Sequence, residues 1–129
     1  MRPRLFLLLK AIVAVTVCIG AHVQARAQEA ACRLTQTMTV AGQKISTDQC
    51  LQNRGLPAPQ FKTLCSTGSE GVPALGIAPM KINYLAACPT ASVNVCDGFA
   101  QGKLTTYYYN KEDGPERKQG CEASGGKFK

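Results

Sequence analysis

The segment Cys88-Pro89-Thr90-Ala91-Ser92-Val93-Asn94-Val95-Cys96 separates two interpretations of the chain, a metal-bound domain and a domain stapled by disulfides. It contains the two cysteines that lie closest together in the sequence, and seven residues stand between them. Structural zinc sites use cysteine pairs only about two to four residues apart, and thioredoxin-type and haem-attachment motifs use C-x-x-C. The spacing therefore favours disulfide bonds over a metal site.

Further cysteines lie on both sides of this segment. Apart from Cys18 near the N-terminus, the chain holds six: Cys32, Cys50, Cys65, Cys88, Cys96 and Cys121. An even number of spaced cysteines in a small exported chain is typical of a disulfide framework, although the spacing does not choose among the pairings. The chain has no Trp and only four Phe. Because such a core is sparse, we expect all six cysteines to be paired and the fold to depend on them.

The N-terminus carries the features of an export signal. Three positive residues precede an uninterrupted run of small and apolar residues over Ala11–Ala21. That run is shorter than the roughly 20 residues of a membrane-spanning helix but suits a signal-peptide core of about 7 to 15 residues. Ala25-Arg26-Ala27 then matches a small-x-small cleavage site. We predict a cleaved signal peptide over residues 1–27 and a single disulfide-rich domain over residues 28–129, periplasmic or secreted.

Three alternatives exist for the N-terminal segment, one of which is a buried N-terminal helix of a cytosolic protein. An uncleaved signal would act as a membrane anchor. Cys18 would carry lipid in a bacterial lipoprotein, but the bulky Val17 before it suits that processing poorly, since small residues are favoured there. Export with cleavage is the preferred interpretation, and the processed chain is expected to have no membrane span.

Loss of residues 1–27 changes the charge and removes the histidine. The net charge falls from +7 to +3, because four positive residues and no acidic ones leave. The remaining Lys and Arg are scattered rather than clustered, which argues against a nucleic-acid partner. His22 is the one histidine of the chain, so the mature domain offers no histidine-based nucleophile and no His-containing metal site. We expect no cofactor and no metal.

Alternating patterns and turn residues predict a short antiparallel sheet. Strands are expected over residues 37–40, 81–87, 93–96 and 104–109. The first of them runs into a turn at Ala41-Gly42. Residues 66–79 are rich in Gly, Ser and Pro and are expected to form a flexible surface loop.

Short helices, two or three in number, complete a predicted α+β fold. The first is expected over Asp48–Asn53, with Thr47 as its N-terminal cap. A second turn of helix carries Phe61, Leu64 and Cys65 at the i, i+3, i+4 spacing of one buried face.

The last predicted helix spans Glu116–Ala123. Asp113 or Gly114 can cap it, and Gly125 can end it in the left-handed conformation. Its interior has almost no apolar stripe, so we expect Cys121 to fasten it to the rest of the domain.

Carboxylates are the remaining route to catalysis. A pair of them can hydrolyse a glycosidic bond without histidine or metal, and Asp48, Glu70 and Asp97 are candidates for such a pair. None of the three lies in a diagnostic local pattern. We therefore expect no catalytic residue and no enzyme, and a small carboxylate-dependent hydrolase acting on envelope polysaccharide is the alternative function.

Three consecutive tyrosines close the strand expected over residues 104–109. Because side chains alternate along a strand, Leu104 and Tyr108 are expected to face the core, with Tyr107 and Tyr109 presented together on the other side. Tyr is enriched at protein interfaces. We predict a non-catalytic binding or interaction module that uses Tyr107 and Tyr109 to contact a protein or an envelope surface. A structural envelope protein without a specific ligand, whose tyrosines fill the core, is a further alternative.

Overall fold

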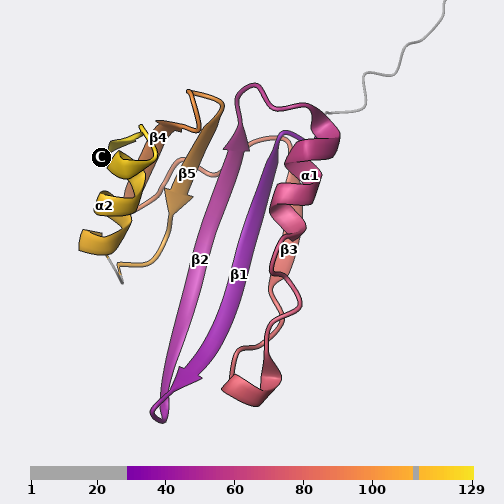
Figure 1. Cartoon of the computed structure of the whole chain (residues 1–129), viewed down its shortest axis with the longest axis vertical. Helices are drawn as coiled ribbons and strands as arrows, with labels where there is room; N and C mark the ends of the chain where they lie inside the picture. Colours follow the sequence, from indigo (N-terminus) through magenta and orange to yellow (C-terminus); the bar gives the residue numbers. More distant parts are fainter. Residues whose placement is uncertain (1–28, 112–113) are drawn as a thin grey trace, which may run out of the picture.

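An antiparallel sheet of six strands organises the part of the chain that the computed structural model describes, residues 29–111 and 114–129. The elements are β1 (Ala31–Val40), β2 (Gln43–Asn53), α1 (Ala58–Ser66), η1 (Pro73–Leu75), β3 (Lys81–Leu85), β4 (Asn94–Phe99), β5 (Leu104–Tyr108), α2 (Gly114–Ala123) and β6 (Lys127–Phe128). The strand order is β3-β1-β2-β5-β4-β6 (Figure 1). The expected α+β class is confirmed, although the sheet dominates more than expected. The segment predicted as a signal peptide, residues 1–27, and the predicted cap Asp113 lie outside the described residues.

β1 and β2 form a long hairpin at the centre of the sheet, and they pair along their whole length. Ala41 and Gly42 join them with φ angles of 50° and 78°. Two positive φ values mark the two-residue turn whose twist matches that of paired strands. The predicted turn is therefore confirmed, but the strand before it begins at Ala31 rather than at Thr37.

The helix expected over Asp48–Asn53 is wrong, because these residues form the second half of β2. Here β2 is paired on both sides, so that Cys50 lies opposite Arg33 of β1 and opposite Tyr107 of β5. Thr47, the expected cap, lies inside the strand as well. A helix of one or two turns is marginal without tertiary packing, whereas a strand with two neighbours gains from both of them.

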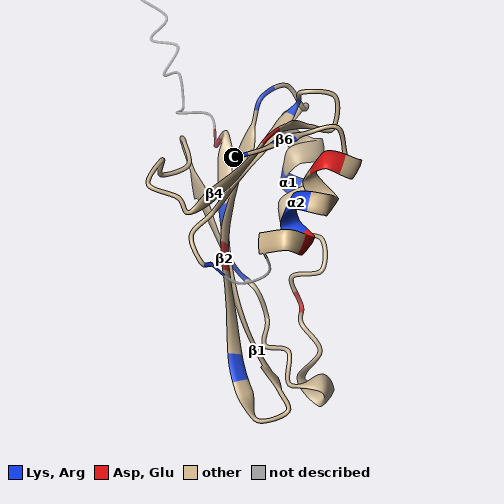
Figure 2. Ribbon diagram, turned by 90° about the vertical axis from the view of Figure 1, so that its left-hand side faces the viewer, with Lys and Arg blue, Asp and Glu red and all other residues tan. Residues whose placement is uncertain are grey.

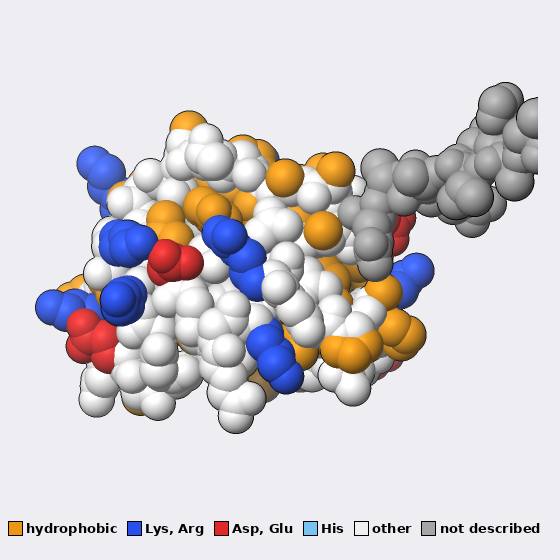
Figure 3. Space-filling model, turned by 90° about the horizontal axis from the view of Figure 1, so that it is seen from above, with side chains coloured by type: hydrophobic (Ala, Val, Ile, Leu, Met, Phe, Trp, Pro, Cys, Tyr) orange, Lys and Arg blue, Asp and Glu red, His pale blue; other side chains and the backbone are white. Residues whose placement is uncertain are grey.

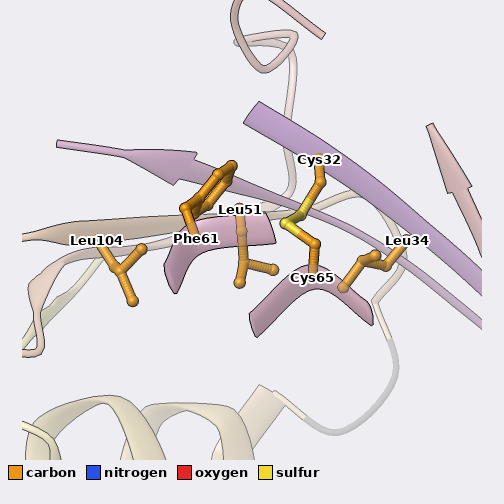
Figure 4. Close-up of a cluster of buried hydrophobic side chains, with 6 residues drawn as sticks. All are labelled: Cys32, Leu34, Leu51, Phe61, Cys65 and Leu104. Carbon is orange, nitrogen blue, oxygen red and sulfur yellow. A yellow bond between two sulfur atoms is a disulfide. The ribbon is translucent and has the colours of Figure 1, made fainter. Parts of the chain in front are cut away.

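Both helices cover the same face of the sheet, which we call the helix side (Figure 2). Its core consists of Cys32, Leu34, Leu51, Phe61, Cys65 and Leu104 (Figure 4). Strand side chains that point to this side meet Phe61 and Cys65 of α1, which are 2% and 0% exposed. Each large apolar side chain buried in this way contributes about 1.5 to 3 kcal/mol. The core therefore lies between the sheet and α1.

α1 buries a narrower face than expected. Phe61 and Cys65 are buried as predicted, but Leu64 is 39% exposed, so its placement in the core is wrong. Successive residues of an α-helix turn by about 100°, which places Leu64 to one side of the line through Phe61 and Cys65.

The segment expected as a flexible loop over residues 66–79 is hydrogen-bonded to the sheet. The Thr39 N–H donates to the Gly76 carbonyl at 3.0 Å, and the Ala78 N–H donates to the Thr37 carbonyl at 3.0 Å. These bonds cover the outer edge of β1 beyond the point where its pairing with β3 ends. The composition predicted the absence of long regular elements but not the attachment to β1.

α2 is fastened to the sheet at two points. Cys121 is its one buried residue among those described, and it is bonded to Cys96 of β4, which confirms the predicted tether. The Arg117 guanidinium lies 4.5 Å from the centre of the Tyr108 ring and donates a hydrogen bond of 2.7 Å to the Asn110 carbonyl. A disulfide and an arginine thus replace the apolar stripe that α2 lacks.

Three disulfides join the six cysteines of the described chain: Cys32–Cys65, Cys50–Cys88 and Cys96–Cys121. This confirms the predicted disulfide framework. Such a framework is typical of proteins outside the reducing cytoplasm. Within the described ranges, no helix has the length and apolar character needed to cross a membrane.

Removal of the third disulfide should loosen α2 selectively. In a Cys96→Ala/Cys121→Ala double variant, α2 loses its tether, and we expect the free energy of unfolding to fall by about 3 kcal/mol. Hydrogen exchange measured by NMR should show faster exchange over residues 114–123, with the β1–β2 pairs still protected. The matched control is Cys32→Ala/Cys65→Ala, which should leave α2 protected. Equal protection of α2 in both variants would show that the disulfide does not hold it.

Replacement of Ala41 by Asn should stabilise the hairpin. A side chain with a Cβ pays about 1 kcal/mol or more for the left-handed conformation, but Asn tolerates it, and Asn-Gly is the preferred pair in this turn. Chemical denaturation should show a free energy of unfolding higher by about 0.5 to 1 kcal/mol. Ala91→Asn, at an exposed position with ordinary φ, should show no gain. A loss of stability in Ala41→Asn would contradict the assigned turn.

Candidate functional site

The face of the sheet opposite the helices, here the open face, is where the candidate binding residues gather (Figure 2). Within the described residues no helix covers it. The loop between β3 and β4 lies over one part, where Cys88 is bonded to Cys50. Strand alternation sends the following side chains to this face: Arg33, Thr35, Thr37, Ser46, Asp48, Cys50, Val95 and Tyr107.

Tyr107 and Tyr109 both lie on the open face and are half-buried. They pack against the cluster formed by Ala31, Cys50 and Cys88. The Tyr109 hydroxyl donates a hydrogen bond of 2.7 Å to the carbonyl of Pro89 in the loop between β3 and β4. Burial raises the pKa of Tyr109, and the nearby arginine partly offsets this rise. Tyr109 therefore connects the end of β5 to the loop between β3 and β4 as well as contributing to the open face.

Arg33 fixes Tyr109 from the side of β1. Its guanidinium carbon lies 4.6 Å from the centre of the Tyr109 ring. The same group donates two hydrogen bonds, of 2.9 and 2.7 Å, to the two carboxylate oxygens of Asp48. The Arg33 and Asp48 side chains are 35% and 30% exposed, so the pair is reachable from solvent. Two-point contact of this kind orients a guanidinium more firmly than one hydrogen bond does.

Val93 and Val95 add apolar surface beside the tyrosines. Val95 lies opposite Tyr107, and the Val93 N–H donates a hydrogen bond of 2.7 Å to the Tyr108 carbonyl. Val95 therefore points to the open face, and Val93 lies just before β4, at the end of β5. Val93 is 42% exposed. We call the group formed by Arg33, Val93, Val95, Tyr107 and Tyr109 the tyrosine patch.

A hollow of about 330 Å³ lies beyond Asp48. Its lining includes Thr35, Thr37, Ser46 and Lys81, so hydroxyl groups and one ammonium group face it. Because Asp48 both lines this hollow and binds Arg33, the hollow continues the tyrosine patch along the sheet. Along the open face, the apolar and aromatic side chains of the tyrosine patch are thus followed by the hydrogen-bonding groups of the hollow.

Tyr108 points the other way, to the helix side, together with Thr106, as the alternation predicted. It lies under Arg117 of α2. Burial raises the pKa of Tyr108, and the positive charge of Arg117 partly offsets the rise. The central tyrosine of the three is therefore half-buried between the sheet and α2, and its two neighbours point to the open face.

The structure does not bring the three predicted carboxylates together. Asp97 is hydrogen-bonded to Thr105, whereas Asp48 lies next to Tyr109, four residues further along the same strand path. With β5 between β2 and β4, strand geometry separates the two carboxylates by roughly 15 Å. Glycosidases hold their pair about 5 to 9.5 Å apart. Glu70 lines a different hollow, on the helix side.

The groups on the open face suit binding by contact and hydrogen bonding. They comprise aromatic rings, aliphatic side chains, hydroxyls and one guanidinium–carboxylate pair. Over the described ranges, no set of three His, Cys, Asp or Glu side chains is placed so that it could hold a metal ion.

Sequence reasoning missed Arg33, Val93 and Val95. Arg33 and Tyr109 are far apart along the chain. The pairing of β2 with β1 on one side and with β5 on the other brings them close together. No local signal marks Arg33, because its role depends on strand order and register. Val95 was assigned to a strand correctly, whereas Val93 lies one residue before that strand begins. Which strand would pair with it was not predictable.

Replacement of Asp97 should reduce the acid sensitivity of the fold. Hydrogen bonds from Lys129 and Thr105 hold the pKa of Asp97 below its usual 3.8. A carboxylate with a lowered folded-state pKa stabilises the fold above its usual pKa, and this contribution is lost as the pH falls through the folded-state value. Between pH 7 and a pH well below 3.8, the Tm of the wild type should therefore fall more than that of Asp97→Asn.

The matched control is Glu122→Gln, which removes an exposed carboxylate of α2 that makes no hydrogen bond within the described chain. Its Tm should follow the wild-type pH dependence. An equally steep fall for Asp97→Asn would show that the bonds from Lys129 and Thr105 do not contribute.

The open face is built from residues of four strands and one disulfide-bonded loop. Its function is inferred from these residues alone, since the chain matches no protein-family model and no curated protein or solved structure is similar to it.

Proposed function

We propose that the protein is an exported, non-catalytic binding module, periplasmic or secreted, that contacts a protein or an envelope surface through the tyrosine patch. The rigid mounting of Tyr109 on the open face carries this proposal. Arg33 lies over its ring, its hydroxyl donates a hydrogen bond to the Pro89 carbonyl, and the cluster around Cys50–Cys88 packs against it. A side chain held in this way loses little conformational entropy when a partner binds.

The composition of the patch also supports a binding role. The exposed Val93 stands beside aromatic rings on a face that is otherwise polar. Apolar and aromatic groups at the centre with polar groups around them are the usual arrangement of a protein interface. An evenly polar face would instead have favoured a structural protein without a specific ligand.

The charges of the patch favour a protein or envelope partner over a nucleic acid. Its one cation, Arg33, is already paired with Asp48. Nucleic-acid binding depends on several Lys and Arg side chains that neutralise phosphates. The three disulfides support the extracytoplasmic location.

A charge placed in the patch should abolish partner capture without unfolding the domain. The immobilised, oxidised protein is incubated with the envelope fraction of its own source, and bound components are quantified by mass spectrometry. We expect Val93→Asp to lower specific capture about tenfold or more, since central interface positions often cost this much. Tyr109→Phe, which keeps the ring, should retain most of the capture.

The matched control is Leu64→Asp, at a similarly exposed apolar position on α1. Thermal unfolding of both Asp variants should remain close to that of the wild type, because neither side chain is buried. The proposal fails if Leu64→Asp loses capture and Val93→Asp keeps it. It also fails if the wild type captures nothing beyond what the bare matrix retains.

A further inference from the structure

A second hollow lies on the helix side, between the end of α1 and the far end of the β1–β2 hairpin. It measures about 530 Å³, within the range of small-molecule sites. Residues from three places line it, among them Met38 of β1, Ser66, Ser69 and Glu70 after α1, and Val72 and Ile77 around η1. We call it the loop hollow. It lies on the opposite side of the sheet from the tyrosine patch and does not depend on its function.

The walls of the loop hollow are held by backbone hydrogen bonds. The N–H of Val72 donates to the Ile77 carbonyl at 2.9 Å, and the N–H of Met80 donates to the Ser69 carbonyl at 2.7 Å. At Gly71, a Cβ atom would lie 2.6 Å from the backbone of Ala78, so the two passes of the segment touch there. A long connection that is fixed in this way often has a functional role.

The floor of the loop hollow is apolar and incompletely covered. Met38 and Ile77 are half-buried, and Val72 is 45% exposed. They lie where the helix layer stops, because α1 ends at Ser66. Covering this surface with an apolar group would be favourable, by about 25 cal/mol for each Å² removed from water.

The polar lining of the loop hollow is made of hydrogen-bond acceptors, hydroxyls and one carboxylate. Gln36, Ser66, Ser69 and Glu70 supply it, and no Lys or Arg belongs to the lining. Within residues 29–111 and 114–129, the Glu70 carboxylate has no hydrogen-bond or salt-bridge partner. A ligand with a positive group would find a counter-charge here, and one with a negative group would not.

We propose that the loop hollow binds a small amphiphile with an ammonium group on a short alkyl or ring portion. The apolar portion covers Met38, Val72 and Ile77. The ammonium group faces Glu70, with the Ser66 and Ser69 hydroxyls as further acceptors. The combination of an apolar floor with an unpaired carboxylate at its edge selects this class over fatty acids and phosphate esters.

The test is a titration of the oxidised protein with n-octylammonium, followed by the backbone amide shifts in two-dimensional NMR. Saturable shifts are expected over residues 36–38 and 66–80. Octanoate, which has the same chain and the opposite charge, should bind at least about fivefold more weakly. Glu70→Gln should weaken octylammonium binding about two- to fivefold, the usual size of an exposed charge contact. Val72→Ser should weaken it as well, because it removes part of the apolar floor.

Glu122→Gln is the matched control, since it changes the net charge equally on α2 and should leave the affinity unchanged. Three results would overturn the proposal: shifts that do not saturate or lie outside residues 36–38 and 66–80, octanoate binding as tight as that of octylammonium, or equal weakening by Glu70→Gln and Glu122→Gln. The spectrum of each unliganded variant shows directly whether it is folded.

Discussion

The antiparallel pairing of β1 with β2 is the interaction on which the rest of the structure depends. β3 attaches to one edge of this hairpin, β5 to the other, and the segment around η1 to the far part of β1. β4, β6 and α2 are connected to it through β5. Two disulfides connect it to other segments on opposite faces of the sheet. Cys32 is bonded to Cys65 of α1, and Cys50 is bonded to Cys88 of the loop after β3. A shift of register by one residue would turn one of the two strands over, so that Cys32 and Cys50 would face the same side and one of these two disulfides could not form.

This arrangement explains how a chain without Trp builds a stable domain. The space-filling view shows apolar side chains scattered among polar ones on the surface seen there rather than gathered into one large area (Figure 3). The buried core on the helix side is small. Half of its members lie on β1 and β2, namely Cys32, Leu34 and Leu51. Covalent links therefore supply part of the stability that a larger core supplies elsewhere. Within residues 29–111 and 114–129, both helices lie on one side of the sheet, and no helix covers the other side.

Local patterns were sufficient for elements whose signals and environment agree. The strands near residues 81–87, 93–96 and 104–109, α1, α2 and the turn at Ala41-Gly42 were predictable because alternation, helical spacing and turn residues act over a few positions. The second half of β2 was not. Its cap-like Thr47 and polar residues are compatible with a helix until β1 and β5 are placed beside them.

The same limit applies to the candidate sites. The alternation of Tyr107, Tyr108 and Tyr109 could be read from the chain, since it follows from strand geometry alone. The contact of Arg33 with Tyr109 could not, because it depends on which strands are neighbours. For the same reason the loop hollow had no counterpart in the sequence, where its lining residues are dispersed from Gln36 to Ile77.

The connectivity of the disulfides has a consequence for biogenesis. Cys32–Cys65 and Cys50–Cys88 interleave along the chain, whereas the third bond joins the last two cysteines. In a polypeptide threaded through a translocation channel N-terminus first, Cys50 emerges before Cys65, so the first thiol that Cys32 meets is a non-native one. Correcting that pair requires thiol–disulfide exchange. The two interleaved bonds of the hairpin therefore allow a non-native Cys32–Cys50 intermediate in a chain exported in this way, whereas the Cys96–Cys121 bond joins cysteines that are neighbours in the sequence.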